Sequence, residues 1–283
     1  MNHTGPNSQK TTRQNVVAII PARFESSRLQ GKVLLEIAGK PMILWVVERT
    51  LAARNVDRVI VATDDERIRE TVKAAGHEVV MTSRDHQSGT DRLAEVASAL
   101  PGPEVIVNVQ GDEPLIAPET IERAVDALIS EECDVGILTT WEQIDSVADA
   151  LNPNVVKIVV NDTGRAVYFS RAPVPHPGEA VRRHGSIELA LQKEPGLIKQ
   201  FKKHTGLYVY RRDVLLKFSQ WEQSKLERIE RLEQLRALEH GVTIKAIEAA
   251  TPSMGVDTAE DLRRVRERVG VSEFSLSTYL TRP

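Results

Sequence analysis

The stretch that decides the fold is Val16 to Lys32, VVAIIPARFESSRLQGK. It opens with a run of apolar residues, which is typical of a short strand buried on both faces of a parallel sheet. Pro21 is expected to end that strand, and the loop that follows carries Arg23, Arg28 and Lys32. Open α/β folds bind ligands at the carboxyl ends of their strands, and cations at this edge can hold a triphosphate. The alternative is an ordinary solvated loop.

The rest of the first half alternates between helices and strands. Helices are expected at 42–53, 63–75, 91–100 and 118–129, and strands at 56–62, 77–81, 105–109 and 135–140. This alternation predicts a mostly parallel, doubly wound (Rossmann-like) α/β sheet with right-handed crossovers. Neither Gly-x-Gly-x-x-Gly after the first strand nor Gly-x-x-x-x-Gly-Lys-Ser/Thr is present, which argues against a dinucleotide-binding oxidoreductase and a P-loop nucleotidase.

The rhythm changes after Asn152, where a smaller α+β lobe is expected. Two short strands around a turn cluster predict a hairpin over 155–169, and three prolines between 173 and 177 predict an extended loop. A strand at 207–210, a long helix at 224–240, a strand at 242–247 and a helix at 259–269 follow. The expected division is a disordered leader at 1–15, an α/β domain at 16–151 and 211–269, a smaller lobe at 152–210, and a poorly held tail at 270–283.

Composition excludes several classes of protein. The 283 residues are 41% hydrophobic and 27% charged, with a net charge of -3, so bulk charge suggests neither nucleic acid nor a membrane surface as a partner. The one cysteine, Cys133, allows no intrachain disulfide and no cysteine-based metal cluster. No apolar stretch is long enough to span a membrane, and the first fifteen residues lack the apolar centre of a secretory signal. A cytoplasmic protein is expected.

Two aspartates are candidates for binding a metal ion. Asp112 follows the strand at 105–109 and therefore lies at the same sheet edge as the basic loop. A carboxylate beside a triphosphate needs a cation between them, which Mg²⁺ can provide, although Asp112 could simply shape a turn before Pro114. Asp257 precedes the last helix and could equally be its N-cap. Two distant aspartates around one cation would suit phosphoryl or nucleotidyl transfer.

Further polar residues are weaker candidates when taken alone. Amide, hydroxyl and backbone groups can satisfy the edge of a pyrimidine base, and an arginine can bind a ligand carboxylate, although such residues are more often solvated or structural. The candidates for reading a base are Ser88, Gly89, Thr90 and Gln110. The candidates in or beside the smaller lobe are Arg171, His204, Tyr208, Glu233 and Gln234.

Several segments together resemble one family, the 3-deoxy-manno-octulosonate (KDO) cytidylyltransferases. The resemblance covers 16–268, and its most specific segments are DHQSGT and NVQGDEP. It implies the reaction of CTP with KDO to give CMP-KDO and pyrophosphate, with Mg²⁺, for lipopolysaccharide synthesis. It also implies a homodimer joined largely through the smaller lobe. The other matching segments are IIPARFESSRLQGK, GKPM, VIVATDDERI, NPNVVKIV, YFSRAPVP, HTGLYVYRR, LERIERLEQLRAL and GVDTAEDL.

The resemblance also implies a role for each candidate. Arg23, Arg28 and Lys32 would bind the triphosphate, and Arg23, Lys32 and Asp112 would be catalytic. Ser88, Gly89, Thr90 and Gln110 would contact cytidine, and Asp112 and Asp257 would bind the metal. Arg171, His204, Tyr208, Glu233 and Gln234 would bind the sugar acid.

The chain departs from the family pattern in two places. Gln30 stands where a proline is usual, and the segment 173–203 is longer than usual, so that Arg182 or Arg183 could supply a second substrate arginine. The second departure leaves a related sugar acid open as the substrate, such as 8-amino-KDO or a sialic acid. A non-catalytic CTP-binding module is the remaining alternative.

Overall fold

The structure of the protein is a computed structural model that describes residues 14–26, 28–86, 88–102, 104–131 and 134–280, with side chains up to Gly270. Cys133 and residues 1–13 of the expected leader lie outside the described residues. Within them, no helix is both long enough and apolar enough to cross a bilayer.

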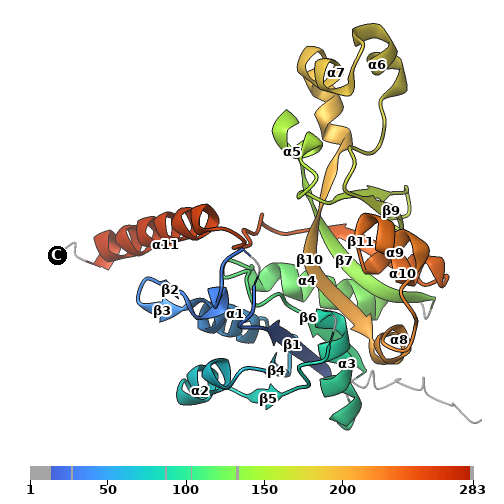
Figure 1. Ribbon diagram of the computed structural model, residues 1–283. Coiled ribbons are helices and arrows are strands. Elements are labelled where there is room, and N and C mark those ends of the chain that lie inside the picture. Colours follow the sequence, from blue (N-terminus) through green and yellow to red (C-terminus); the bar gives the residue numbers. More distant parts are fainter. Residues whose placement is uncertain (1–13, 27, 87, 103, 132–133, 281–283) are drawn as a thin grey trace, which may run out of the picture.

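A single large sheet organises the molecule (Figure 1). Its main path runs β11-β7-β10-β6-β1-β4-β5, and β8 and β9 extend it from β10. All neighbours on the main path are parallel except β10, which is antiparallel to both β6 and β7. The strands are β1 (Val16–Ala22), β4 (Arg58–Thr63), β5 (Val79–Met81), β6 (Val105–Asn108), β7 (Val135–Gln143), β8 (Lys157–Val160), β9 (Ala166–Ser170), β10 (Lys202–Arg211) and β11 (Thr243–Glu248).

Helices cover both faces of the sheet, which confirms the doubly wound α/β fold. Along β1 the side chains alternate: Ala18 and Ile20 belong to one buried cluster, and Val17 and Ile19 belong to another. The first cluster includes residues of α1 (Met42–Leu51) and α4 (Pro118–Ser130), and α2 (Glu66–Ala74) packs on the same face. The second includes residues of α3 (Gly89–Ala99), α8 (Arg212–Phe218) and α10 (Gln234–Glu239).

β1 is longer than expected, because it continues through Pro21 to Ala22. β1 pairs with β6 only from Val16 to Ile19, whereas Pro21 is opposite Ala62 of β4. The missing N–H of Pro21 therefore costs no ladder hydrogen bond on the β6 side, so the proline is tolerated inside the strand.

The smaller lobe at the top of Figure 1 has its own apolar cluster, built around Ile144, Leu191 and Phe201. It contains α5 (Val147–Leu151), α6 (Gly178–His184), α7 (Ile187–Lys193) and the 3-10 helix at Pro195–Gln200. β10 begins beside β8 and then runs into the centre of the main sheet. β10, whose last residues were expected to be a strand of the smaller lobe at 152–210, thus pairs with β6 and β7 of the main sheet. The division of the chain into domains stays a prediction.

The helix expected over 224–240 is two helices, α9 (Lys225–Glu230) and α10 (Gln234–Glu239). Arg231, with a φ of 54°, adopts the left-handed conformation between them. The apolar spacing runs on across the break, and no glycine or proline marks it, so the sequence pattern could not reveal it. The break places Glu233 and Gln234 at the start of α10.

The last helix, α11 (Ala259–Leu280), is also longer than expected and includes most of the predicted tail. It begins against the body, where Leu262 and Val265 pack with Ile37, Met42 and Val256, and then projects away in Figure 1. The remaining elements are the 3-10 helix Lys32–Leu34 and the two-residue strands β2 (Glu36–Ile37) and β3 (Lys40–Pro41).

Candidate active site

Three charged side chains from distant parts of the chain meet at the carboxyl edge of the sheet. The Nζ of Lys32 lies 2.5 Å from Oδ2 of Asp112 and 2.8 Å from Oδ1 of Asp257. Lys32 begins the 3-10 helix after β1, Asp112 follows β6, and Asp257 precedes α11. The structure thus brings the two predicted metal ligands together around one cation.

Short contacts hold the two aspartate loops in place. A Cβ on Gly111 would lie 2.9 Å from the carbonyl oxygen of Pro21, so glycine lets the Asp112 loop pack this closely against the end of β1. The N–H of Val256 donates to the carbonyl oxygen of Asp112 at 2.9 Å. This bond joins the loop that carries Asp112 to the segment that carries Asp257.

Thr258, rather than its neighbour Asp257, is the N-cap of α11. Thr258 Oγ1 accepts from the N–H of Asp261 at 3.2 Å, and Asp261 Oδ2 accepts from the N–H of Thr258 at 2.9 Å. This reciprocal pair is a capping box at the start of α11. Because Thr258 caps the helix, the carboxylate of Asp257 is available to pair with Lys32.

The three charges stabilise one another. Burial disfavours the ammonium of Lys32, but the charge of Asp112 and the hydrogen bonds to both aspartates outweigh burial and raise the pKa of Lys32. Burial likewise disfavours the carboxylate of Asp257, but Lys32 lowers the pKa of that group. At neutral pH Lys32 is therefore a cation, and it holds the two carboxylates close together.

The two carboxylates fit a divalent cation that prefers oxygen ligands. Mg²⁺ at nucleotide sites is bound through one or two carboxylates, while phosphates and water supply its other ligands. Asp112 and Asp257 already converge on one positive charge. Among the described residues, no group of three or more His, Cys, Asp or Glu side chains could hold a metal by itself. The protein's share of a Mg²⁺ site would therefore be these two carboxylates.

A cleft of about 420 Å³ opens beside this cluster. Arg28 reaches it from the basic loop, and its Nη1 lies 3.5 Å from Oδ2 of Asp257. Of the predicted nucleotide-binding residues, only Thr90, which is fully buried, does not line the cleft. The predicted residues that do line it are Arg23, Arg28, Lys32, Ser88, Gly89, Gln110, Asp112 and Asp257.

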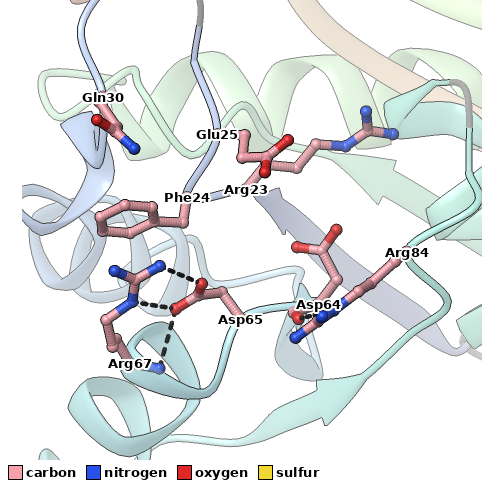
Figure 2. Close-up of a pocket in the computed structure, with 8 residues that line it drawn as sticks. All are labelled: Arg23, Phe24, Glu25, Gln30, Asp64, Asp65, Arg67 and Arg84. Carbon is pink, nitrogen blue, oxygen red and sulfur yellow. Dashed lines mark hydrogen bonds and ion pairs between the residues drawn. The ribbon is translucent and has the colours of Figure 1, made fainter.

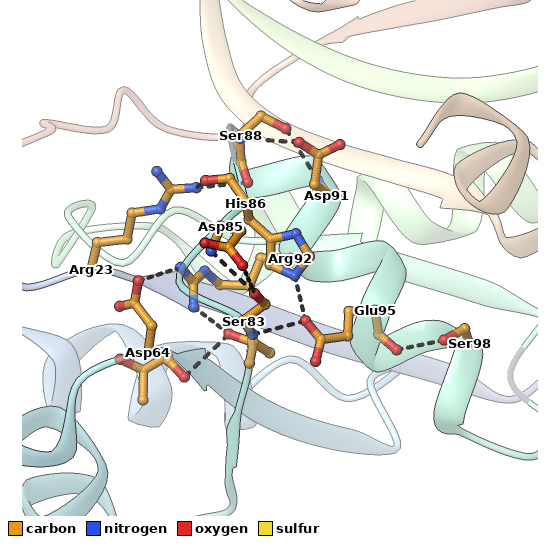
Figure 3. Close-up of polar contacts among 12 residues, drawn as sticks. Arg23, Asp64, Ser83, Asp85, His86, Ser88, Asp91, Arg92, Glu95 and Ser98 are labelled. Atoms are coloured by element: carbon orange, nitrogen blue, oxygen red, sulfur yellow. Dashed lines mark hydrogen bonds and ion pairs between the residues drawn. The ribbon is translucent and has the colours of Figure 1, made fainter. Parts of the chain in front are cut away.

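Arg23 is partly committed to the backbone of the chain (Figure 3). Its Nη2 donates to the carbonyl oxygens of His86 at 2.8 Å and Ser88 at 2.9 Å. Burial, followed by the nearby charge of Arg92, lowers the pKa of Arg23. Arg23 therefore ties the loop before α3 to the end of β1, in addition to lining the cleft.

Ser88 has a structural role of its own. Its Oγ accepts from the N–H of Asp91 at 3.1 Å, and the carboxylate of Asp91 accepts from the N–H of Ser88 at 3.1 Å, which is a capping box at the start of α3. The cap fixes the position of Gly89, which lines the cleft with its backbone because it has no side chain.

A second cavity, of about 490 Å³, shares Arg23 and Glu25 with this cleft (Figure 2). Its charges are balanced, because three arginines and three carboxylates line it. The guanidinium of Arg67 lies 3.2 Å from the centroid of the Phe24 ring and also pairs with Asp65 at 2.6 Å. This balance does not favour an anion such as the triphosphate. The lining residues are Arg23, Phe24, Glu25, Gln30, Asp64, Asp65, Arg67 and Arg84.

A group of polar side chains next to the cleft, Thr90, Glu233, His204 and Tyr208, is called the floor below, although these residues do not line the cleft itself. Thr90 Oγ1 donates to Glu233 Oε1 at 2.6 Å, whereas Oε2 of Glu233 is buried without a hydrogen-bond partner among the described residues. Burial raises the pKa of Glu233. Gln110 Nε2 lies 3.2 Å from the carbonyl oxygen of Gly206, which connects the cleft to β10.

His204 and Tyr208 lie on β10 in the same floor. Nε2 of His204 lies 2.9 Å from Thr139 Oγ1, and its ring contacts Phe169 and Tyr208 at centroid distances of 5.1 and 5.2 Å. Burial lowers the pKa of His204 to about 3 and raises that of Tyr208 well above its usual value. Both rings are therefore neutral at physiological pH.

The remaining predicted sugar-acid residues are placed differently. The guanidinium of Arg171 donates to the carbonyl oxygens of Glu230 at 2.8 Å, Pro153 at 3.1 Å and Arg231 at 3.3 Å. These bonds brace the break between α9 and α10, so Arg171 is committed to the backbone. Gln234, 6% exposed, begins α10 beside Glu233.

Two networks were missed by the sequence analysis. Arg92 is fully buried on α3; it pairs with Asp64 at 2.8 Å and also contacts Thr82 Oγ1 (Figure 3). A charged residue within an apolar helix face was the available signal. Glu113 was not singled out as a candidate, but burial, followed by the charge of Asp112, raises its pKa to about 7.

Comparison with known proteins identifies the family. A family model described as cytidylyltransferase matches residues 17–244. A 3-deoxy-manno-octulosonate cytidylyltransferase of Geobacter sulfurreducens is 50% identical over 255 residues, which cover 90% of this chain and 99% of that protein. The protein of the same name from Vibrio cholerae serotype O1 is 44% identical over 254 residues, covering 89% of this chain and 96% of that protein.

Solved structures agree. A CMP:2-keto-3-deoxy-manno-octonic acid synthetase complexed with CTP aligns with a TM-score of 0.81 at 40% identity, over 92% of this chain and 100% of that one. A 4-diphosphocytidyl-2C-methyl-D-erythritol synthase of Anaerococcus prevotii, 12% identical, aligns with a TM-score of 0.59 over 91% of this chain and 99% of that one, which shows a shared fold alone. Sequence identity over nine-tenths of its length therefore shows that the chain belongs to the cytidylyltransferase family, among the 3-deoxy-manno-octulosonate cytidylyltransferases.

Proposed function

We propose that the protein transfers CMP from CTP to the anomeric hydroxyl of KDO and releases pyrophosphate, which activates KDO for lipopolysaccharide synthesis. The observation that carries the proposal is the meeting of Asp112 and Asp257 at Lys32, on the wall of a cleft that Gln110, Ser88 and Gly89 also line. Metal-binding carboxylates beside a cationic loop and an uncharged polar wall suit a nucleoside triphosphate. The family and its relatives support the same reaction.

The charges in the cleft suit the chemistry of the transfer. The anomeric oxygen forms a bond to the α-phosphorus of CTP, the bond from that phosphorus to the bridging oxygen breaks, and the hydroxyl proton passes to solvent. Negative charge grows on the departing pyrophosphate, and Arg28 and Lys32 would offset it there. Mg²⁺ bound by Asp112 and Asp257 would neutralise further phosphate charge.

Lys32 would change partners when the substrate binds. In this structure its ammonium contacts both aspartates. A triphosphate offers the same ammonium stronger and more numerous acceptor oxygens, and a divalent cation offers the carboxylates a larger charge. We therefore expect Lys32 to hold the aspartates together until metal and nucleotide replace it.

The floor would select the sugar acid. Glu233 presents a buried oxygen that has no hydrogen-bond partner within the described part of the chain and that a sugar hydroxyl could satisfy, and His204 and Tyr208 add uncharged hydrogen-bonding groups. Arg171 and Gln234 complete the predicted set; Arg171 would need to exchange one of its carbonyl partners to meet the sugar carboxylate. Mg²⁺ as the metal, a homodimer joined through the smaller lobe and a cytoplasmic location are parts of the same proposal.

The test is pyrophosphate release from CTP with and without Mg²⁺, using KDO, 8-amino-KDO and a sialic acid as acceptors. We expect Mg²⁺-dependent release with KDO at the highest kcat/KM. A higher kcat/KM with either other sugar acid would move the assignment to that substrate. CTP binding without release for any acceptor would favour the non-catalytic module.

A further inference from the structure

The segment between β11 and α11, residues 249–258, crosses the carboxyl edge of the sheet and carries Asp257. Hydrogen bonds pin it at several points. Near its start, the N–H of Ala249 donates to the carbonyl oxygen of Trp141 at 2.9 Å, and that of Ala250 donates to Thr120 Oγ1 at 3.1 Å. Near its end, Val256 is bound to the carbonyl oxygen of Asp112. The middle of the segment depends on Ser253.

Ser253 is held by two carboxylates from different elements. Its N–H donates to Oε1 of Glu142 at 2.8 Å, and its Oγ donates to Oε2 of Glu113 at 3.1 Å. Glu142, on β7, is 8% exposed, and its Oε2 lies 3.2 Å from the Nζ of Lys203. Glu142 is thus anchored independently, whereas the bond from Ser253 to Glu113 links two loops that each carry one aspartate.

Glu113 is confined from the other side by β10. A Cβ on Gly206 would lie 2.9 Å from Oε1 of Glu113 and 2.9 Å from Cγ of Gln110. β10 changes register between His204 and Tyr208, around this glycine. The glycine therefore leaves room for Glu113 to lie against β10 and reach Ser253 while its neighbour Asp112 faces Lys32.

We propose that Glu113 and Ser253 are positioning residues that set the separation of Asp112 and Asp257, and thereby the affinity of the site for a divalent cation. Neither residue touches the cation: Glu113 acts through its neighbour Asp112, and Ser253 acts through the segment that leads to Asp257. The inference rests on the proposed function, because it takes those aspartates as the metal ligands. The new element is the hydrogen bond between Ser253 and Glu113, which fixes the positions of the two aspartates relative to each other. Metal affinity depends on such groups because they orient the ligands.

The experiment measures Mn²⁺ binding to the full-length protein directly, from the electron paramagnetic resonance signal of free Mn²⁺, without substrate. Ser253→Ala removes the hydroxyl, and we expect Kd for Mn²⁺ to rise about tenfold, within the range found when groups that orient metal ligands are removed. Ser253→Thr keeps a hydroxyl and should restore binding to within about threefold of wild type. Glu113→Gln keeps an acceptor oxygen and should do the same, whereas Glu113→Ala should behave like Ser253→Ala.

Two controls separate positioning from general damage. Ser98→Ala removes a hydroxyl that bonds within α3, to the carbonyl oxygen of Glu95, and should leave Kd for Mn²⁺ unchanged. CTP binding in EDTA reports the cleft without metal, and it should be unchanged in Ser253→Ala. An equal loss of metal-free CTP binding, or wild-type Mn²⁺ affinity in folded Ser253→Ala, would overturn the inference. If Ser253→Ala does not fold, wild-type Mn²⁺ affinity in folded Glu113→Ala would do so.

The same set of measurements keeps this inference apart from the proposed function. Asp112→Asn shows whether the wild-type Mn²⁺ signal belongs to this site, and pyrophosphate release by the wild-type protein tests the reaction. Normal release together with unchanged Mn²⁺ affinity in both alanine variants would leave the function standing and remove the positioning role. Absence of release in the wild type would count against the function itself.

Discussion

The rim and the floor of the site hold their polar groups in opposite ways. At the rim, Lys32, Asp112 and Asp257 are charged, and the side chains of the two aspartates are 29% and 53% exposed. On the floor, His204 is partly buried and neutral. Charges at the rim are paired with each other and can exchange partners when a ligand arrives. Groups on the floor are already arranged, and changing them costs stability because they are buried.

The largest expected effect is at the rim. Asp112→Asn removes one of the two carboxylates, and we expect kcat/KM for pyrophosphate release to fall about 10³-fold, since electrostatic groups at a reacting centre contribute on this scale. The unfolding midpoint should change little because Asp112 is partly exposed. Asp162→Asn, in an exposed turn, is the matched control. Normal turnover and normal Mg²⁺ dependence in Asp112→Asn would refute its metal role.

Lys32→Met tests whether Lys32 shares its place with a metal ion. We expect kcat/KM to fall about 10²-fold. Without Lys32, the two carboxylates face each other with only the exposed Arg28 near Asp257, so the metal-free variant should unfold at a lower temperature than the wild type. Mg²⁺ should then raise the melting temperature of the variant more than that of the wild type. Equal Mg²⁺ stabilisation of both proteins would separate Lys32 from the metal site.

The floor should contribute to the pH dependence of the free energy of unfolding, through His204. His204 has a pKa of about 3 in the folded protein and about 6.5 when unfolded, so the unfolded chain binds more protons between these values and stability falls as pH drops. From pH 7 to pH 5 this amounts to about 2 kcal/mol. His204→Gln should lack this part of the slope, as measured by urea unfolding at both pH values. Identical slopes would show that His204 is not buried in its neutral form.

Arg28 should show the smallest effect. It lies 3.5 Å from Asp257, and both side chains are more than half exposed, so Arg28→Ala should change the free energy of unfolding by less than about 0.5 kcal/mol. KM for CTP should rise by less than about tenfold, because one solvated phosphate contact is lost. A larger loss of stability than in His204→Gln at pH 7 would reverse the contrast between rim and floor.

The rim was easier to predict from the sequence than the floor, for a physical reason. Lys32 and Asp112 each follow a buried strand, and parallel strands bring their carboxyl ends to one edge, so the meeting of these residues follows from local patterns. The floor depends on contacts without a local signature. Thr90 is hydrogen-bonded to Glu233, which is 143 residues away in the sequence. The position of Glu233 depends on the break between the two helices at Arg231, and no glycine or proline marks that break in the sequence.

Arg171 shows the limit of assigning a residue by type. An arginine in this part of the chain suggested a partner for a ligand carboxylate, but its guanidinium donates to three backbone carbonyls, those of Glu230 and Arg231 at that break and that of Pro153 before β8. The antiparallel course of β10 was missed for a related reason, because only Leu207 to Tyr210 reads as a strand while the polar residues before it join β7 and β8.

The most direct test of the account is a crystal structure with Mn²⁺ and a non-hydrolysable CTP analogue, in which anomalous scattering locates the metal. We predict one peak in contact with the carboxylates of both Asp112 and Asp257 and with phosphate oxygens, at about the 2 Å distances typical of such hard cations, with Lys32 Nζ moved from the aspartates to the phosphates. A peak away from either aspartate, or a Lys32 that stays between them while the nucleotide is bound, would contradict the account.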